Sequence, residues 1–137
     1  MATRIKSTSP DQGTNVALID AVDGVTVASA DGALPKEGVV FITKGSAAAL
    51  TLATPTAGLP NAATPGDDGK VLTVVSTTAF AHTITTAANK IVDGSTTTKD
   101  TFTFPAHAGG VAKVVAYNGL WYALVGDTVV LAALTEV

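Results

Sequence analysis

The side chains that could perform acid–base or metal chemistry in this chain are few and far apart. His82 and His107 are its only imidazoles, and no HxH or HExxH spacing brings two histidines to one zinc ion. His82 lies in the alternating segment AFAHTITTA, where we expect a half-buried ring bonded to a backbone or threonine group. We expect His107, in FPAHAGG, to lie in a loop beside a turn. Neither histidine is predicted to be catalytic.

The acidic pair Asp67-Asp68 stands in the glycine-flanked sequence PGDDGK. A calcium loop needs several oxygen ligands at regular spacing, and this segment supplies only two carboxylates. Asp starts turns and glycine accepts positive φ without strain, so we predict a turn that ends at Gly69. The chain also lacks GxSxG, the phosphate-binding GxxxxGK[ST] and any cysteine. We therefore predict no enzymatic activity, no metal site and no cofactor.

The three largest amphipathic side chains are clustered. Tyr117, Trp121 and Tyr122 lie in VVAYNGLWYAL, residues 114–124, although only 5% of the chain is aromatic. They form either a ligand-stacking platform or the closing hairpin of a small β-domain. Asn118-Gly119 suits a type I′ turn, because both residues accept positive φ. The expected cross-strand pairs are Tyr117 with Leu120, Ala116 with Trp121, and Val115 with Tyr122. Trp121 and Tyr122 then point to opposite faces, which favours the hairpin over a platform.

The elements that must position these residues are short and rich in β-branched side chains. Strands are expected at 39–43, 50–52, 70–75, 79–87, 90–92 and around Phe102 and Phe104, and Lys44-Gly45-Ser46 is expected to close a hairpin. Residues 56–69 read as a loop. VALIDAV, residues 16–22, suits a short helix or a strand, and so does the C-terminal TVVLAALTEV. These features predict an all-β fold, an antiparallel β-sandwich or barrel of about seven to nine short strands.

Composition indicates one domain with an appended arm. At 137 residues the chain can bury one core, and residues 38–137 are expected to form that body. Residues 1–37 begin without hydrophobic period and contain several Gly breaks, so we predict an extended N-terminal arm there. Charged residues make up only 14% of the chain. Because a charge-poor surface favours association, the protein is expected to act against a partner.

Other composition features exclude several classes of partner. The net charge is −3, and the eight basic residues are scattered, which argues against nucleic-acid binding. No apolar run reaches 18 residues, so we expect no membrane span. The polar N-terminus MATRIKSTSPDQG lacks the apolar core of a secretory signal.

Two segments together resemble small virion proteins of tailed bacteriophages. They are PGDDGKVLTVVSTTAFAHTITT and FTFPAHAGGVAKVVAYNGLWYAL, and the resemblance covers about residues 38–125. The proteins they resemble are head decoration (cement) proteins and head-fibre modules. The resemblance implies a compact β-module, often a homotrimer, on the outer capsid surface of the virion after synthesis in the host cytoplasm. It implies that the major capsid protein is the partner and that neighbouring capsid subunits are bridged.

Within this hypothesis, the arm is the segment that contacts the capsid shell. Its apolar side chains lie in a segment too short for a core of its own, so we expect them to dock; they are Ile5, Val16, Leu18 and Ile19. The alternative function is a host-surface or glycan-binding module of a phage head fibre or tail fibre. In that alternative, Tyr117, Trp121 and Tyr122 would stack on the ligand.

Overall fold

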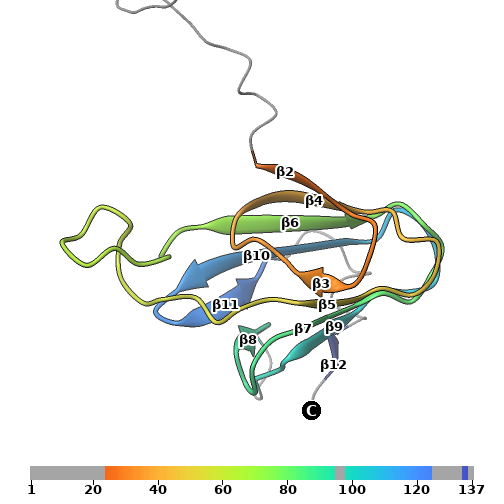
Figure 1. Cartoon of the computed structure of the whole chain (residues 1–137). Helices are drawn as coiled ribbons and strands as arrows, with labels where there is room; N and C mark the ends of the chain where they lie inside the picture. Colours follow the sequence, from red (N-terminus) through yellow and green to blue (C-terminus); the bar gives the residue numbers. More distant parts are fainter. Residues whose placement is uncertain (1–23, 95–97, 125–133, 136–137) are drawn as a thin grey trace, which may run out of the picture.

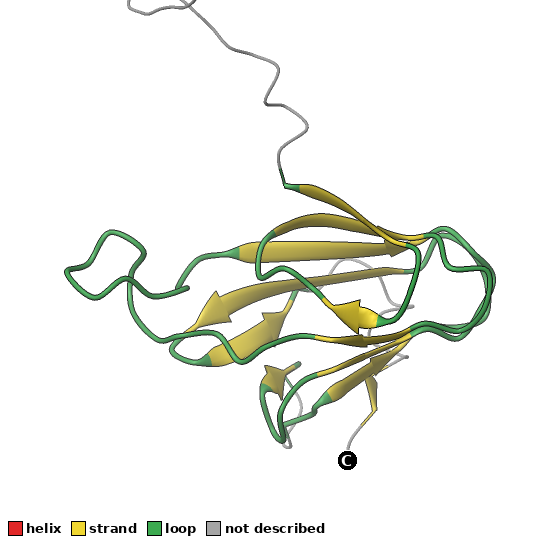
Figure 2. Cartoon of the chain, viewed as in Figure 1, coloured by secondary structure: helices red, strands yellow, loops and turns green. Residues whose placement is uncertain are grey.

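The computed structural model describes residues 24–94, 98–124 and 134–135, and all regular structure among them is β (Figures 1 and 2). Within those ranges, no helix is long and apolar enough to cross a membrane. The strands form two sheets, and both contain parallel as well as antiparallel pairs. The predicted all-β class agrees with this arrangement, but the predicted antiparallel sandwich or barrel is wrong.

Eleven strands are present in the described residues. The six-stranded sheet has the order β2 (Val25–Ala28), β4 (Gly38–Ile42), β6 (Val71–Ser76), β10 (Val111–Tyr117), β11 (Leu120–Ala123) and β8 (Ile91–Val92). The five-stranded sheet has the order β12 (Leu134–Thr135), β9 (Thr101–Thr103), β7 (Thr83–Thr85), β5 (Ala49–Thr51) and β3 (Gly32–Ala33). The number exceeds the expected seven to nine partly because several strands have only two residues; short β-segments were expected before residue 38, and β2 and β3 are paired within the two sheets.

Parallel pairing arises because consecutive strands lie in different sheets. The chain crosses from β2 to β3, from β4 to β5 and from β6 to β7, so these three crossings lie one above another (Figure 1). In the six-stranded sheet β4 is parallel to both β2 and β6, and in the five-stranded sheet β5 is parallel to both β3 and β7. The predicted hairpin at Lys44-Gly45-Ser46 is therefore wrong. That segment is an arch between sheets, and β4 does not pair with β5.

The second arch, between β4 and β5, and the third arch, between β6 and β7, are separated by a constant number of residues. Val39 is opposite Thr73 in one sheet and Ala49 is opposite Thr83 in the other, a separation of 34 residues in both cases. Backbone bonds join the stacked arches: the Thr77 N–H donates to the Ile42 carbonyl at 3.0 Å. Because the separation is constant across the arch, the two segments match residue by residue through both sheets.

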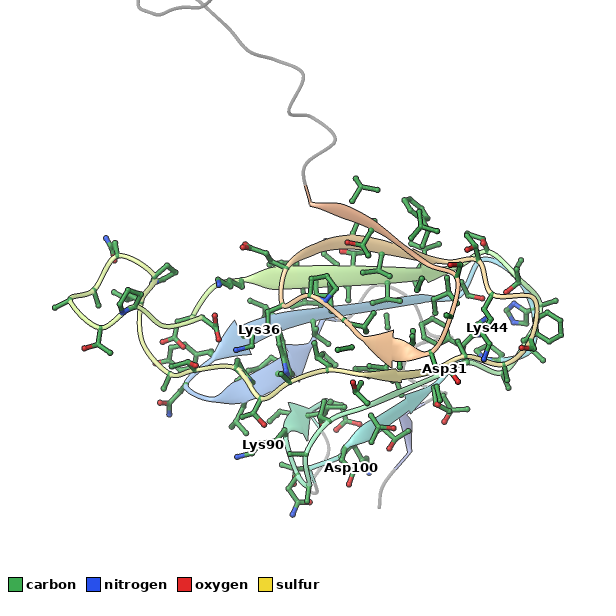
Figure 3. The ribbon with its side chains drawn as sticks, in the orientation of Figure 1. Asp31, Lys36, Lys44, Lys90 and Asp100 are labelled. Carbon is green, nitrogen blue, oxygen red and sulfur yellow. The ribbon has the colours of Figure 1, made fainter. Side chains whose placement is uncertain are left out.

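A salt bridge joins the first arch, between β2 and β3, to the second arch. The Lys44 ammonium donates to the Asp31 carboxylate, with 2.6 Å between Nζ and Oδ1, and the same carboxylate oxygen accepts the Ala49 N–H at 2.9 Å (Figure 3). Asp31 precedes β3 and Lys44 follows β4. The contact therefore holds the shorter first arch in register with its neighbour.

The antiparallel part of the fold follows the arches. Strand β10 pairs with both β6 and β11, and β9 pairs with β7 and β12. Strand β12 places part of the C-terminal segment TVVLAALTEV in a strand. Strand β7 is shorter than the expected 79–87, because residues 79–82 belong to the third arch.

The core lies between the two sheets. Strand alternation directs one set of side chains inward from each sheet. Those inward side chains, all at most 3% exposed, include Val40, Ile42, Leu50, Leu72, Val74, Ile84, Phe102, Val114 and Trp121.

The body begins earlier than the sequence analysis expected. Strands β2 and β3 pair with β4 and β5, and Leu34 is 7% exposed within the core cluster. Residues 25–34, which the sequence analysis placed in the arm, therefore contribute to the two sheets and their core. Local pattern does not reveal these strands, because Asp-Gly turns interrupt the segment and β2 and β3 pair with strands that come later in the chain. The docking candidates Ile5, Val16, Leu18 and Ile19 lie outside the described residues.

Candidate interaction site at the hairpin end

The aromatic residues lie on the hairpin that the sequence predicts. Asn118 has φ 50° and Gly119 has φ 80°, as a type I′ turn requires. The register is the expected one, with Ala116 opposite Trp121 and Val115 opposite Tyr122. The hairpin turn lies at the end of the molecule opposite the arches (Figure 1).

Strand alternation divides the three aromatic rings between two environments. Trp121 is completely buried, and its Nε1–H donates to the Ala53 carbonyl at 3.0 Å. Tyr117 is 59% exposed on the opposite face, where its ring centroid lies 6.3 Å from that of Tyr122. Trp121 therefore has no exposed ring face for a ligand. A glycan would have to stack on Tyr117 and Tyr122 alone.

A protruding loop, residues 56–68, lies at the same end of the molecule (Figure 1). Its base is closed by the Asp67 N–H, which donates to the Thr56 carbonyl at 2.7 Å, and by the Asp68 N–H, which donates to the Gly58 carbonyl at 2.9 Å. A side chain at Gly66 would place its Cβ against the carbonyl oxygens of Ala57 and Gly58. Glycine at this position therefore permits the two chain segments to meet.

The outer part of this loop is uncharged. Residues 59–65, LPNAATP, are all exposed, and Leu59 is 60% exposed. Short loops with a closed base are held by their own contacts and often carry binding residues. The loop therefore presents a neutral, partly apolar contact surface on a fixed base.

Asp67 is the residue that fixes this base. Its carboxylate accepts hydrogen bonds from Lys36 Nζ at 2.8 Å, the Thr56 N–H at 2.7 Å and Lys70 Nζ at 2.9 Å (Lys36 is labelled in Figure 3). The side chain is only 9% exposed. The Lys36 ammonium, followed by the Thr56 N–H and the Lys70 ammonium, holds the pKa of Asp67 far below its usual range. All three donors stabilise the ionised carboxylate, which ties β6 and the segment after β3 to the loop.

Asp68 joins the loop base to the hairpin. Its Oδ1 accepts the Asn118 N–H at 2.7 Å, and the Gly69 N–H donates to the Ala116 carbonyl at 2.8 Å. The Lys70 N–H donates to the Asp67 carbonyl at 3.0 Å, which confirms the turn predicted for Asp67-Asp68-Gly69. Both carboxylates of PGDDGK are therefore used for structure. Among the described residues, no group of three His, Asp or Glu side chains could hold a metal ion.

His82 is fully buried and is used to join arches. It lies in the third arch, immediately before β7, rather than within a strand. The Ala48 N–H donates to Nδ1 at 3.0 Å, so the ring proton lies on Nε2, which is 3.0 Å from Thr78 Oγ1. The Thr78 hydroxyl in turn donates to the Lys44 carbonyl at 2.9 Å. The predicted bonding to backbone and threonine groups is confirmed, although the burial is complete rather than partial.

His107 lies at the surface in the connection between β9 and β10. Its Nδ1 is 3.3 Å from the Ala108 carbonyl oxygen. This matches the loop position expected from FPAHAGG. The His107 ring thus contacts a neighbouring backbone group, whereas the His82 ring is held by the distant Ala48 N–H and the Thr78 hydroxyl.

Sequence reasoning missed the ionic contacts of this site. Lys36 and Asp67 are 31 residues apart, and Lys36 lies in the segment that the sequence predicts as an arm. No local pattern joins them, because the contact depends on where the arch crossings place each segment. Compared with known protein families, curated proteins and solved structures, the chain gives no match.

Proposed function

We propose that this protein is a non-enzymatic structural component of a tailed-bacteriophage virion. It binds the outer capsid surface as a homotrimer and bridges neighbouring subunits of the major capsid protein, which stabilises the shell. The resemblance of residues 38–125 to head decoration and head-fibre proteins is the basis for the capsid as partner. In this proposal each added subunit contact raises the work needed to separate capsomers under internal pressure.

The observation that supports this function best is that the buried polar side chains bond to other parts of the body, which makes it rigid. The Asp67 carboxylate is occupied by three donors at the loop base, and the two ring nitrogens of His82 lie within bonding distance of Ala48 in the neighbouring arch and of Thr78 in its own arch. The exposed outer part of the protruding loop, residues 59–65, is neutral. A rigid body with a charge-poor contact surface suits a permanent partner better than a reacting small molecule.

The N-terminal residues supply the second contact in this proposal. The chain enters the body at β2, the edge strand of the six-stranded sheet. In this proposal the residues before β2 contact a neighbouring capsid subunit while the body stays in place. Ile5, Val16, Leu18 and Ile19 are the proposed docking residues. Ordering such a segment costs roughly 1–2 kcal/mol per residue, so several apolar contacts are needed to offset it.

Deletion of residues 1–15 is expected to abolish capsid binding and leave the body folded. The deletion removes Ile5 and the polar start of the arm but no described strand. Binding would be measured by cosedimentation with capsids assembled without this protein, and folding by far-UV circular dichroism and thermal unfolding.

A matched point variant separates docking from chain length. Leu18→Ser/Ile19→Ser keeps the full chain and removes two proposed docking side chains, so its binding should also fall. Wild-type binding by both the truncated chain and this variant would overturn the docking role of the arm. If neither the full-length chain nor any variant bound capsids, the proposed function itself would be wrong.

A further inference from the structure

The two sheets differ in the chemistry of their outer faces. On the six-stranded sheet, Val27, Phe41, Val75 and Val111 form one row in register, and every member is half-buried or exposed. A second row contains Val71, Val115 and Tyr122. Alternation directs these side chains away from the core, since Val40, Leu72, Val74 and Val114 point inward, although Val111 at the start of β10 also packs partly against the core cluster.

The outer face of the five-stranded sheet provides the comparison. Thr51, Thr85 and Thr101 form one row in register, and Thr83 and Thr103 are opposite each other in the next. Leu50, Ile84 and Phe102 of the same strands are buried. A sheet face directed to water normally carries polar side chains, as this threonine face does. The valine-rich face departs from that pattern within the same molecule.

Charge on the valine-rich face is almost absent. Among the outward positions of the six described strands, Lys113 is the single charged side chain, and Thr73 is opposite it. A nucleic acid or an anionic surface would call for many more cations. The partner that fits this face is therefore apolar and nearly uncharged over the same area.

The width of the face limits what can cover it. The six strands contain between two and seven residues each, and at about 4.8 Å by 3.3 Å per residue they give an area of roughly 450 Å². That is of the order of one side of a standard protein interface, about 800 Å² of accessible surface. One extended segment covers only about the width of two strands, whereas a second sheet packs face to face at about 10 Å.

We infer that the outer face of the six-stranded sheet is the surface through which copies of this chain associate. The same face on a second copy supplies the required flatness, width and apolar character. The inference does not depend on capsid binding. In the homotrimer under Proposed function, the three faces would be directed to the shared axis and would enclose an apolar core.

Native mass measured by light scattering behind a sizing column tests this inference on the full chain. Wild type is expected at two or three times the 13.6 kDa of one chain. Val75→Lys/Val115→Lys places two charges at the centre of the face and is expected at the mass of one chain. Thr51→Lys/Thr85→Lys is the matched control, with the same substitutions on the threonine face, and is expected to keep the wild-type mass.

A gentler variant covers the case in which the lysine variant does not fold. Val75→Thr/Val115→Thr keeps side-chain shape and strand propensity, and should raise the dissociation constant by roughly 100-fold or more. Circular dichroism would confirm that the variants fold. A wild-type protein that stays monomeric at ~100 μM would overturn the inference, as would an unchanged dissociation constant in the threonine variant. Capsid binding is a separate measurement, so either proposal can fail alone.

Discussion

Replacement of Trp121 by alanine is expected to destabilise the protein by about 3–5 kcal/mol, as removal of a large buried aromatic side chain generally does. The ring is fully buried in the cluster between the sheets, so its loss leaves a cavity. The Nε1–H bond to the Ala53 carbonyl, which attaches β11 to the segment after β5, is lost as well. Because whole domains have only about 5–15 kcal/mol of stability, this single change should remove a large part of it.

Tyr117→Ala is the matched control for Trp121→Ala. It removes an aromatic ring of similar size from the same hairpin, but from a position that is 59% exposed. We expect a loss of no more than about 1 kcal/mol. Both free energies of unfolding would be measured in urea at a protein concentration where the variants have the same native mass. Equal losses for the two variants would contradict the division of the aromatic rings between core and surface.

Replacement of Asp67 by asparagine is expected to destabilise the protein by about 2–4 kcal/mol at pH 7, because Lys36 and Lys70 lose their shared carboxylate. The effect should depend on pH. The pKa of Asp67 is lowered in the folded state, whereas in the unfolded chain it is about 3.9. The unfolded state therefore binds more protons as the pH falls. The contribution is complete above about pH 5 and decreases as the pH drops below about 4 towards the folded-state pKa.

Asp68→Asn is the control for the charge at position 67. The asparagine Oδ1 can still accept the Asn118 N–H, so we expect a loss below about 1 kcal/mol. Unfolding free energies of both variants and wild type would be measured from pH 7 to pH 2. The difference between wild type and Asp67→Asn should narrow in acid. A difference that stays constant over this range would show that the carboxylate charge does not fix the loop base.

The parts of the fold that follow from local chemistry could be predicted from the sequence. Asn118-Gly119 determines both the turn and the register of the flanking strands, because a two-residue type I′ turn leaves one pairing. The turn at Asp67-Asp68-Gly69 and the loop before it also follow from residue types. His82 was expected to bond backbone and threonine groups, and it does so through Ala48 and Thr78.

The arches could not be predicted in the same way. The apolar alternation along 39–43 and 50–52 is the same whether these two strands pair with each other or with strands elsewhere in the chain. The pattern therefore does not distinguish a hairpin from an arch. What identifies the arches is the constant separation of 34 residues between β4 and β6 and between β5 and β7. This separation becomes apparent only from the strand pairing in both sheets. The contact between Lys36 and Asp67 was missed for the same reason.

One signal for the proposed association surface lies in the sequence. VLTVV and VAKVVAY are apolar at most of both alternating positions, with Thr73 and Lys113 as the exceptions, although a strand with one face in water needs apolar residues at only one. The burial of alternate members, Leu72 and Val74 against Val71 and Val75, shows which set faces the core. The second set is the one for which a partner is proposed.

The most direct test of the proposed function is the thermal stability of capsids with and without this protein. Full-length chain would be added to tailed-phage capsids assembled without any decoration protein, and the temperature of capsid disruption would be measured. We predict saturable binding and a disruption temperature that rises with occupancy until the sites are filled. No binding at saturating concentration, or full occupancy with an unchanged disruption temperature, would contradict a cementing role.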